Sequence, residues 1–89
     1  MIAERKVSLP NKLGLHARPA MQLVELANKF SSVICITKNG QKVDCKNMLA
    51  VLTLAAPQGT MLLVSADGDD AEDAIESVCG LIEVGFGED

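Results

Sequence analysis

The sequence predicts an α+β fold in which helices cover one face of a four-stranded antiparallel sheet. Three observations lead to this prediction: the element order β-α-β-β-α-β-α over 89 residues, two long amphipathic helices, and an Asn-Gly turn between two β-rich segments. Each amphipathic helix needs an apolar surface to pack on, and one face of an antiparallel sheet provides it. We therefore expect an open-faced two-layer sandwich that forms a single domain over residues 1–89.

The first strand is expected over residues 2–9, where side chains alternate in polarity until Pro10 and Asn11 indicate a turn. A long helix is then expected to begin at Ala17 and to end near residues 28–29. Its apolar side chains follow the spacing i, i+3, i+4 and i+7 of a helix with one buried side, and they are Ala20, Leu23, Val24 and Ala27.

The middle of the chain predicts a β-hairpin. Residues 33–37 are rich in β-branched side chains, which favour strands. They are followed by Asn39-Gly40, a pair that tolerates the positive φ angles of a type I′ turn. The return strand is expected over residues 41–45.

A short helical segment is expected over residues 47–54, because Asn47 can cap its N-terminus. The Pro-Gln-Gly sequence at residues 57–59 then interrupts the chain. An apolar strand follows over residues 60–66.

The last long helix is expected to follow a turn at residues 68–69 and to end near Gly85. Its first turn is acidic, which suits the helix dipole, and Asp69 and Glu72 have the spacing of a capping box. The segment Asp-Gly-Asp-Asp-Ala-Glu-Asp does not fit a calcium loop, because its glycine is second rather than sixth and the twelfth place holds valine. Residues 87–89 are expected to fray. The apolar positions of the helix are Ala71, Ala74, Ile75, Val78 and Ile82.

Composition excludes several classes of function. A net charge of −4 and only two aromatic residues argue against a nucleic-acid interface, which needs basic and stacking side chains. Three cysteines without C-x-x-C spacing indicate free thiols rather than a disulfide framework or a zinc site. The chain has no apolar segment of leader or membrane-spanning length, so we expect a cytoplasmic protein without membrane insertion. No metal or other cofactor is indicated.

The only histidine, His16, lies directly before the first predicted helix. If His16 is the N-cap, the amide N–H groups of Ala17 and Arg18 have no acceptor within the helix. These donors, the helix dipole and the Arg18 guanidinium would together bind an anion such as a phosphoryl group. Pro19 is tolerated in this first turn, and Gly14 allows a tight turn and a close approach.

A neutral imidazole at such a site can act as the nucleophile in phosphoryl transfer. Local spacing alone, however, favours a simpler interpretation, since a single histidine at a helix start is more often a capping or solvated residue. Arg18 can likewise be a solvated helix residue.

Two segments resemble a known family. "GLHARPA" resembles the active-site signature of the histidine-containing phosphocarrier (HPr) proteins of the bacterial phosphoenolpyruvate-dependent phosphotransferase system, and "KNMLAVLTLAAPQG" resembles the second motif of that family. The resemblance implies the open-faced sandwich fold and a carrier rather than an enzyme. It further implies that enzyme I, charged from phosphoenolpyruvate, phosphorylates Nδ1 of His16, and that the phosphoryl group then passes to a histidine of a IIA-type domain.

Some positions depart from the common pattern of the family. Asn47 stands where Gram-positive members have a regulatory serine, so control by the serine kinase is not expected. Leu13 replaces a small polar residue, and Glu25 replaces a lysine of the enteric sugar-system members. These departures, with "NKLGLHARPAM" and "GFGED", look more like the nitrogen-related branch than the sugar-transport branch.

A carrier docks with two partners in turn, which calls for a small apolar surface with a polar rim. We expect a monomer in which this surface lies beside His16, although the same residues can instead be core. Two alternatives to the carrier remain: a regulatory protein-interaction module, and a small-molecule-binding domain with the same fold. The candidate partner-surface residues are Leu15, Ala20, Met21, Asn47, Met48, Leu49 and Leu52.

Overall fold

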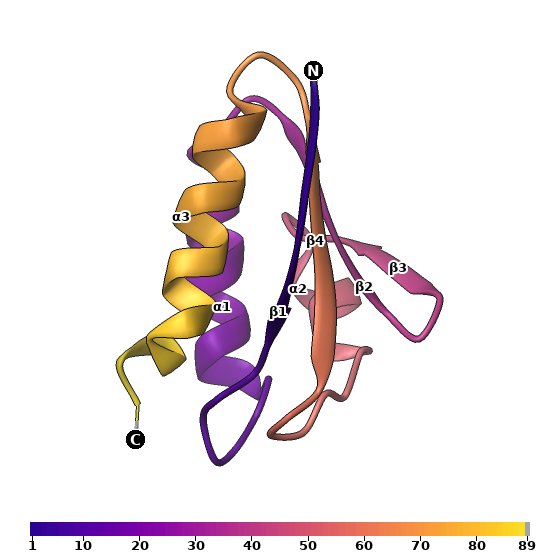
Figure 1. Cartoon of the computed structure of the whole chain (residues 1–89). Coiled ribbons are helices and arrows are strands. Elements are labelled where there is room, and N and C mark those ends of the chain that lie inside the picture. The colour runs from indigo at the N-terminus through magenta and orange to yellow at the C-terminus, as the bar shows by residue number, and fades with distance from the viewer. Residues whose placement is uncertain (89) are drawn as a thin grey trace.

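The computed structural model describes residues 1–88 and has the expected order of elements (Figure 1). The elements are β1 (Ile2–Ser8), α1 (Ala17–Ala27), β2 (Val33–Lys38), β3 (Gln41–Asp44), α2 (Met48–Leu52), β4 (Met61–Asp67), α3 (Ala71–Glu83) and the 3-10 turn η1 (Gly85–Gly87).

The four strands form one sheet in the order β1-β4-β2-β3, with every neighbouring pair antiparallel. The helices α1 and α3 lie side by side over one face of this sheet (Figure 1). The segment between β1 and α1, the segment between α2 and β4, and the C-terminal turn all lie at the same end of the molecule (Figure 1). The predicted α+β sandwich is therefore confirmed.

The core lies between the sheet and the two long helices, and alternation along the central strands creates it. In the middle of β2 and β4 every second side chain is buried, while those between are half-buried on the open face. The amphipathic stripes of α1 and α3 cover the buried side chains, as the helical spacing predicts. Fully buried members include Leu23, Ile34, Ile36, Leu62, Val64, Val78 and Ile82.

Two local predictions are confirmed by the backbone. Asn39 and Gly40 have φ angles of 48° and 84°, as the hairpin turn between β2 and β3 requires. Asn47 caps α2, because the Ala50 N–H donates to its side-chain oxygen over 3.0 Å.

The predicted capping box at the start of α3 is wrong. The N-cap is Asp70 rather than Asp69, and its side chain makes no hydrogen bond to its own helix. Its carboxylate instead accepts hydrogen bonds from the backbone N–H groups of Ser31 and Ser32, both at 2.9 Å, and from the Ser32 hydroxyl. Three donors from another segment satisfy the carboxylate better than one helix amide, and α3 is thereby tied to the chain that follows α1.

Asp70 is expected to make the stability of the fold depend on acidic pH. The hydrogen bonds from the Ser32 hydroxyl and the Ser31 N–H lower the pKa of Asp70 from 3.8 to about 2. Because this pKa is depressed in the folded state, ionised Asp70 stabilises the fold fully above pH 3.8. This stabilisation is lost as the pH falls towards about 2.

Asp70→Asn should lower the midpoint temperature of thermal unfolding at neutral pH, as followed by circular dichroism. Between pH 3.8 and about 2, this midpoint should fall less in the variant than in wild type. Asp69→Asn is the matched control, since Asp69 is exposed and this substitution removes the same charge from the same turn. Equal changes in both variants would show that the hydrogen bonds of Asp70 contribute nothing.

The prediction that residues 87–89 fray is wrong for Gly87 and Glu88, while Asp89 lies outside the described residues. Phe86 is buried at 4% exposure and has a φ of 58°, which turns the chain back after α3. The Glu88 N–H donates to the Gly85 carbonyl over 2.9 Å. Burial of this aromatic ring thus fixes a tail that its small and charged residues alone would not order.

Within residues 1–88, every helix is too short or too polar to cross a membrane.

Candidate functional site

His16 is the N-cap of α1, as expected, with the extended backbone angles φ −99° and ψ −171°. Its carbonyl accepts the first helical hydrogen bond, from the Ala20 N–H over 3.0 Å. The imidazole makes no capping hydrogen bond, and 34% of the side chain is exposed. The backbone of His16 therefore begins the helix while its ring is left for other contacts.

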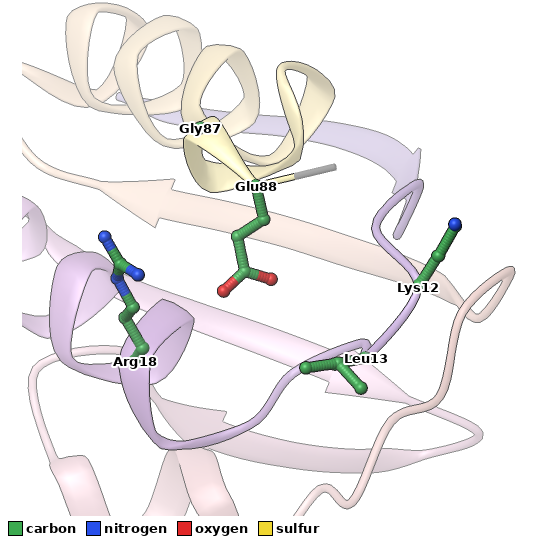
Figure 2. Close-up of a pocket in the computed structure, with 5 residues that line it drawn as sticks. All are labelled: Lys12, Leu13, Arg18, Gly87 and Glu88. Carbon is green, nitrogen blue, oxygen red and sulfur yellow. The ribbon is translucent and has the colours of Figure 1, made fainter.

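The residues after His16 provide donors for an anion. Ala17 and Arg18 are exposed in the first turn, where their N–H groups have no acceptor within the helix. Pro19 follows and is buried, which fixes this turn against the core. The Arg18 side chain extends beside the tail, so its guanidinium faces the same hollow as the carboxylate of Glu88 (Figure 2).

Gly14 is required by the chain's own packing. Its φ is 65°, and a Cβ there would collide with the Ala56 carbonyl oxygen and lie 2.8 Å from the Cα of Pro57. The next residue, Leu15, donates its N–H to the same Ala56 carbonyl over 2.8 Å. The second family-like segment thus supports the turn that presents His16.

A carboxylate also belongs to the site, and the sequence did not indicate it. Both carboxylate oxygens of Glu88 lie close to Nε2 of His16, at 2.9 and 3.1 Å. Asn11 is 1% exposed, and its side-chain NH₂ donates to Glu88 over 2.9 Å and to the Gly14 carbonyl over 2.8 Å. The Pro-Asn turn is a weak signal for Asn11, whereas nothing in the local sequence brings Glu88 to a residue 72 positions earlier.

The electrostatics of this network keep the tail carboxylate ionised. Hydrogen bonds from His16 and then from Asn11 lower the pKa of Glu88, and the nearby charge of Arg18 acts in the same direction. Beside the carboxylate lies an open hollow of about 430 Å³, and Figure 2 shows the Glu88 side chain extending from the tail between Arg18 and Leu13. Its lining residues are Lys12, Leu13, Arg18, Gly87 and Glu88.

Leu15 and Ala20 do not belong to an exposed partner surface, because they are only 4% and 0% exposed. They occupy the N′ and N4 positions of α1, where apolar residues commonly pack together and fix the entry of the chain into a helix. The helical spacing already places Ala20 on the buried side of α1, whereas Leu15 lies in the turn before the helix and outside that pattern.

The other candidates for the partner surface are at least partly exposed. Leu49 is 77% exposed and Met21 is 52% exposed, while Asn47 is exposed and both Met48 and Leu52 are half-buried. The helices α1 and α2 that bear them pack against each other. The exposed apolar side chains of Met21 and Leu49 therefore lie on two helices that contact each other.

Cys45 next to Lys46 is not a second reactive group. Burial raises the pKa of the Cys45 thiol to about 12, so the thiol is protonated at neutral pH. Among residues 1–88, no three His, Cys, Asp or Glu side chains gather as metal ligands would.

The comparison with known families shows the family to which the chain belongs. Residues 3–84 match the family model described as "PTS HPr component phosphorylation site". The chain belongs to the HPr family. Members of this family are phosphocarrier proteins rather than enzymes, so the predicted family and the predicted carrier class are both confirmed.

Relatives named HPr and a relative named NPr are both similar to the chain. The phosphocarrier protein HPr of Cupriavidus necator is 39% identical over 96% of each chain. The phosphocarrier protein NPr of Proteus mirabilis is 38% identical over 100% of each chain. The crystal structure of HPr-C-His from Thermoanaerobacter tengcongensis has a TM-score of 0.94 and 44% identity, and the match covers 98% of each chain.

Proposed function

We propose that this HPr-family chain carries a phosphoryl group on Nδ1 of His16, receives it from enzyme I charged by phosphoenolpyruvate, and passes it to a histidine of a IIA-type domain. The observation that carries the proposal is a half-exposed imidazole at the N-terminus of α1 whose ring makes no capping bond. The family match over residues 3–84 supports the same role.

The transfer needs little more than one nucleophile and a few donors. The Nδ1 lone pair of His16 forms a bond to phosphorus while the bond from phosphorus to the donor nitrogen breaks, and the donor nitrogen keeps that electron pair. The free N–H groups of Ala17 and Arg18 and the Arg18 guanidinium bind the phosphoryl oxygens. The same groups release the phosphoryl group when an acceptor histidine attacks.

The proposed docking patch consists of Met21, Met48, Leu49 and Leu52, with Asn47 on its polar rim. Its two most exposed side chains, Leu49 and Met21, lie on adjacent helices. Flexible methionines suit a surface that must fit a donor and an acceptor in turn.

Leu49→Ser should raise the KM for enzyme I roughly tenfold, because burying an exposed leucine in the complex contributes about 1.5 kcal/mol. Steady-state phosphorylation rates measure this change, and thermal unfolding should show little loss of stability. Ile2→Ser is the control, since Ile2 is 71% exposed and lies at the opposite end of β1 from the site (Figure 1). A KM unchanged by Leu49→Ser would remove α2 from the docking surface.

The branch is proposed to be the nitrogen-related one. Leu13 lies exposed at the rim of the hollow, and Glu25 is exposed on α1, at the two places where the sequence departs from the sugar-system pattern. Identities of 39% to an HPr and 38% to an NPr do not separate the branches, so the donor must be tested directly.

Intact-mass analysis after incubation with phosphoenolpyruvate and enzyme I of either branch tests both levels of the proposal. We expect one acid-labile phosphoryl gain, formed faster with the nitrogen-related donor and absent in His16→Ala. A faster reaction with the sugar-system donor would reverse the branch. No gain with either donor, from a folded sample, would contradict the carrier role of His16.

The proposal treats residues 1–89 as one cytoplasmic domain that acts as a monomer, since one copy contains every group that the transfer uses. Light scattering on the eluting protein should give the mass of a single chain, and a dimer mass would contradict this part.

A further inference from the structure

The contact between Glu88 and His16 determines which ring nitrogen is a nucleophile. An ionised carboxylate only accepts hydrogen bonds, so the hydrogen between it and Nε2 belongs to the imidazole. In the neutral ring the other nitrogen, Nδ1, then carries the free lone pair. The carboxylate also occupies the side of the ring from which a donor would approach Nε2.

We propose that Glu88 is a positioning residue for phosphoryl transfer, which keeps Nε2 of His16 protonated and blocked and so presents Nδ1 alone. This inference rests on the proposed function and adds a residue to its site. It assigns a task to the C-terminal tail, which lies outside the two segments that resemble the motifs of the family.

The tail is built to hold the carboxylate in place. Phe86 anchors it in the core, and the side chain of Glu88 is only 17% exposed. The Asn11 side-chain NH₂ donates to Oε1 of this carboxylate and is itself fixed by its hydrogen bond to the Gly14 carbonyl. Two supports from different parts of the chain thus position one carboxylate, which distinguishes it from a flexible surface ion pair.

Glu88 also stabilises the charge that develops during the transfer. When Nδ1 forms its bond to phosphorus, the ring keeps its Nε2 hydrogen and becomes positively charged, while the donor nitrogen recovers its electron pair. A carboxylate 2.9 Å from Nε2 interacts more favourably with this charged ring than with the neutral one. In the Ser-His-Asp hydrolases, the aspartate orients and stabilises its histidine in the same way.

The tautomer of His16 can be measured without any partner protein. In ¹⁵N-labelled wild type, at a pH where the ring is neutral, Nε2 should give the signal of a protonated nitrogen and Nδ1 that of an unprotonated one. In Glu88→Gln the amide can donate as well as accept, so both signals should move towards an average of the two tautomers. Glu76→Gln, an exposed carboxylate of α3, is the control and should match wild type.

The site of phosphorylation is tested with phosphoramidate, a chemical donor that loses its amine as ammonia when its phosphorus-nitrogen bond breaks. Wild type should be phosphorylated on Nδ1 only, as shown by ³¹P–¹⁵N coupling, whereas Glu88→Gln should carry part of the phosphoryl group on Nε2. With enzyme I as donor, Glu88→Gln should lower kcat about tenfold and leave KM unchanged, because a charge-assisted hydrogen bond to the charged ring is weakened.

An unchanged tautomer and an unchanged phosphorylation site in Glu88→Gln would overturn the proposal. A faster reaction of Glu88→Gln would also overturn it, since the carboxylate would then obstruct the transfer. If enzyme I failed to phosphorylate the wild type, the proposed function would be wrong, while the tautomer and phosphoramidate measurements would still decide the role of Glu88.

Discussion

Replacing His16 with glutamine is expected to abolish phosphoryl uptake and to leave the fold intact. The chain has a single histidine, so no other imidazole can take over the nucleophilic role. The ring makes no capping hydrogen bond to α1, and its carbonyl, which begins the helix, is kept in the variant. Stability should therefore change little.

Intact-mass analysis with enzyme I and phosphoenolpyruvate should show no phosphoryl gain in His16→Gln, while circular dichroism should match wild type. Gln22→Ala, a half-buried position on the same helix, serves as the control for handling and should be phosphorylated normally. A gain of wild-type size in His16→Gln would place the phosphoryl group on another residue.

Replacing Arg18 with alanine is expected to reduce the rate of phosphorylation about a hundredfold, because removing one preorganised donor from a transferring group has an effect of that order. The guanidinium faces the hollow beside His16, and its fork can bind two phosphoryl oxygens at once. Arg18→Lys keeps the charge but loses the two-pronged guanidinium, so its rate should lie between those of Arg18→Ala and wild type.

Rapid-quench measurement of kcat with enzyme I separates this effect from docking, which should change KM instead. Lys29→Ala removes an exposed cation just beyond the other end of α1 and should leave kcat unchanged. Equal rates for Arg18→Ala and wild type would exclude a role of the guanidinium in the transfer.

Most of the fold follows from patterns that repeat over short distances. The apolar spacing of α1 and α3 and the alternation of β2 and β4 are each contained within a dozen residues or so. Asn39-Gly40 and the Asn47 cap depend on backbone preferences of the residues themselves, so they too could be predicted.

The failures share one physical cause, which is contact between segments far apart in the chain. Asp70 binds the segment at residues 31–32 rather than its own helix, and Glu88 binds His16 from the opposite end of the sequence. Neither contact produces a periodic pattern in the sequence. The burial of Leu15 likewise accompanies a distant contact, since its N–H donates to the Ala56 carbonyl.

The candidate site was predictable where it is contiguous. A helix start displays its free amides beside His16 and Arg18, and the resemblance of "GLHARPA" to the family signature favours a phosphoryl site over a simple cap there. The roles of Asn11 and Glu88 follow only from the structure, which places the Glu88 carboxylate within hydrogen-bond distance of Asn11 and His16.

The most direct test of the central claim is a complete relay with purified components. A labelled phosphoryl group is supplied as phosphoenolpyruvate to enzyme I, and its arrival on a IIA-type domain is followed with this chain present, absent, or replaced by His16→Gln. We predict transfer only when the wild-type chain is present, with a labelled intermediate on His16. Arrival at the same rate without the chain, or with His16→Gln, would contradict a phosphoryl relay through this histidine.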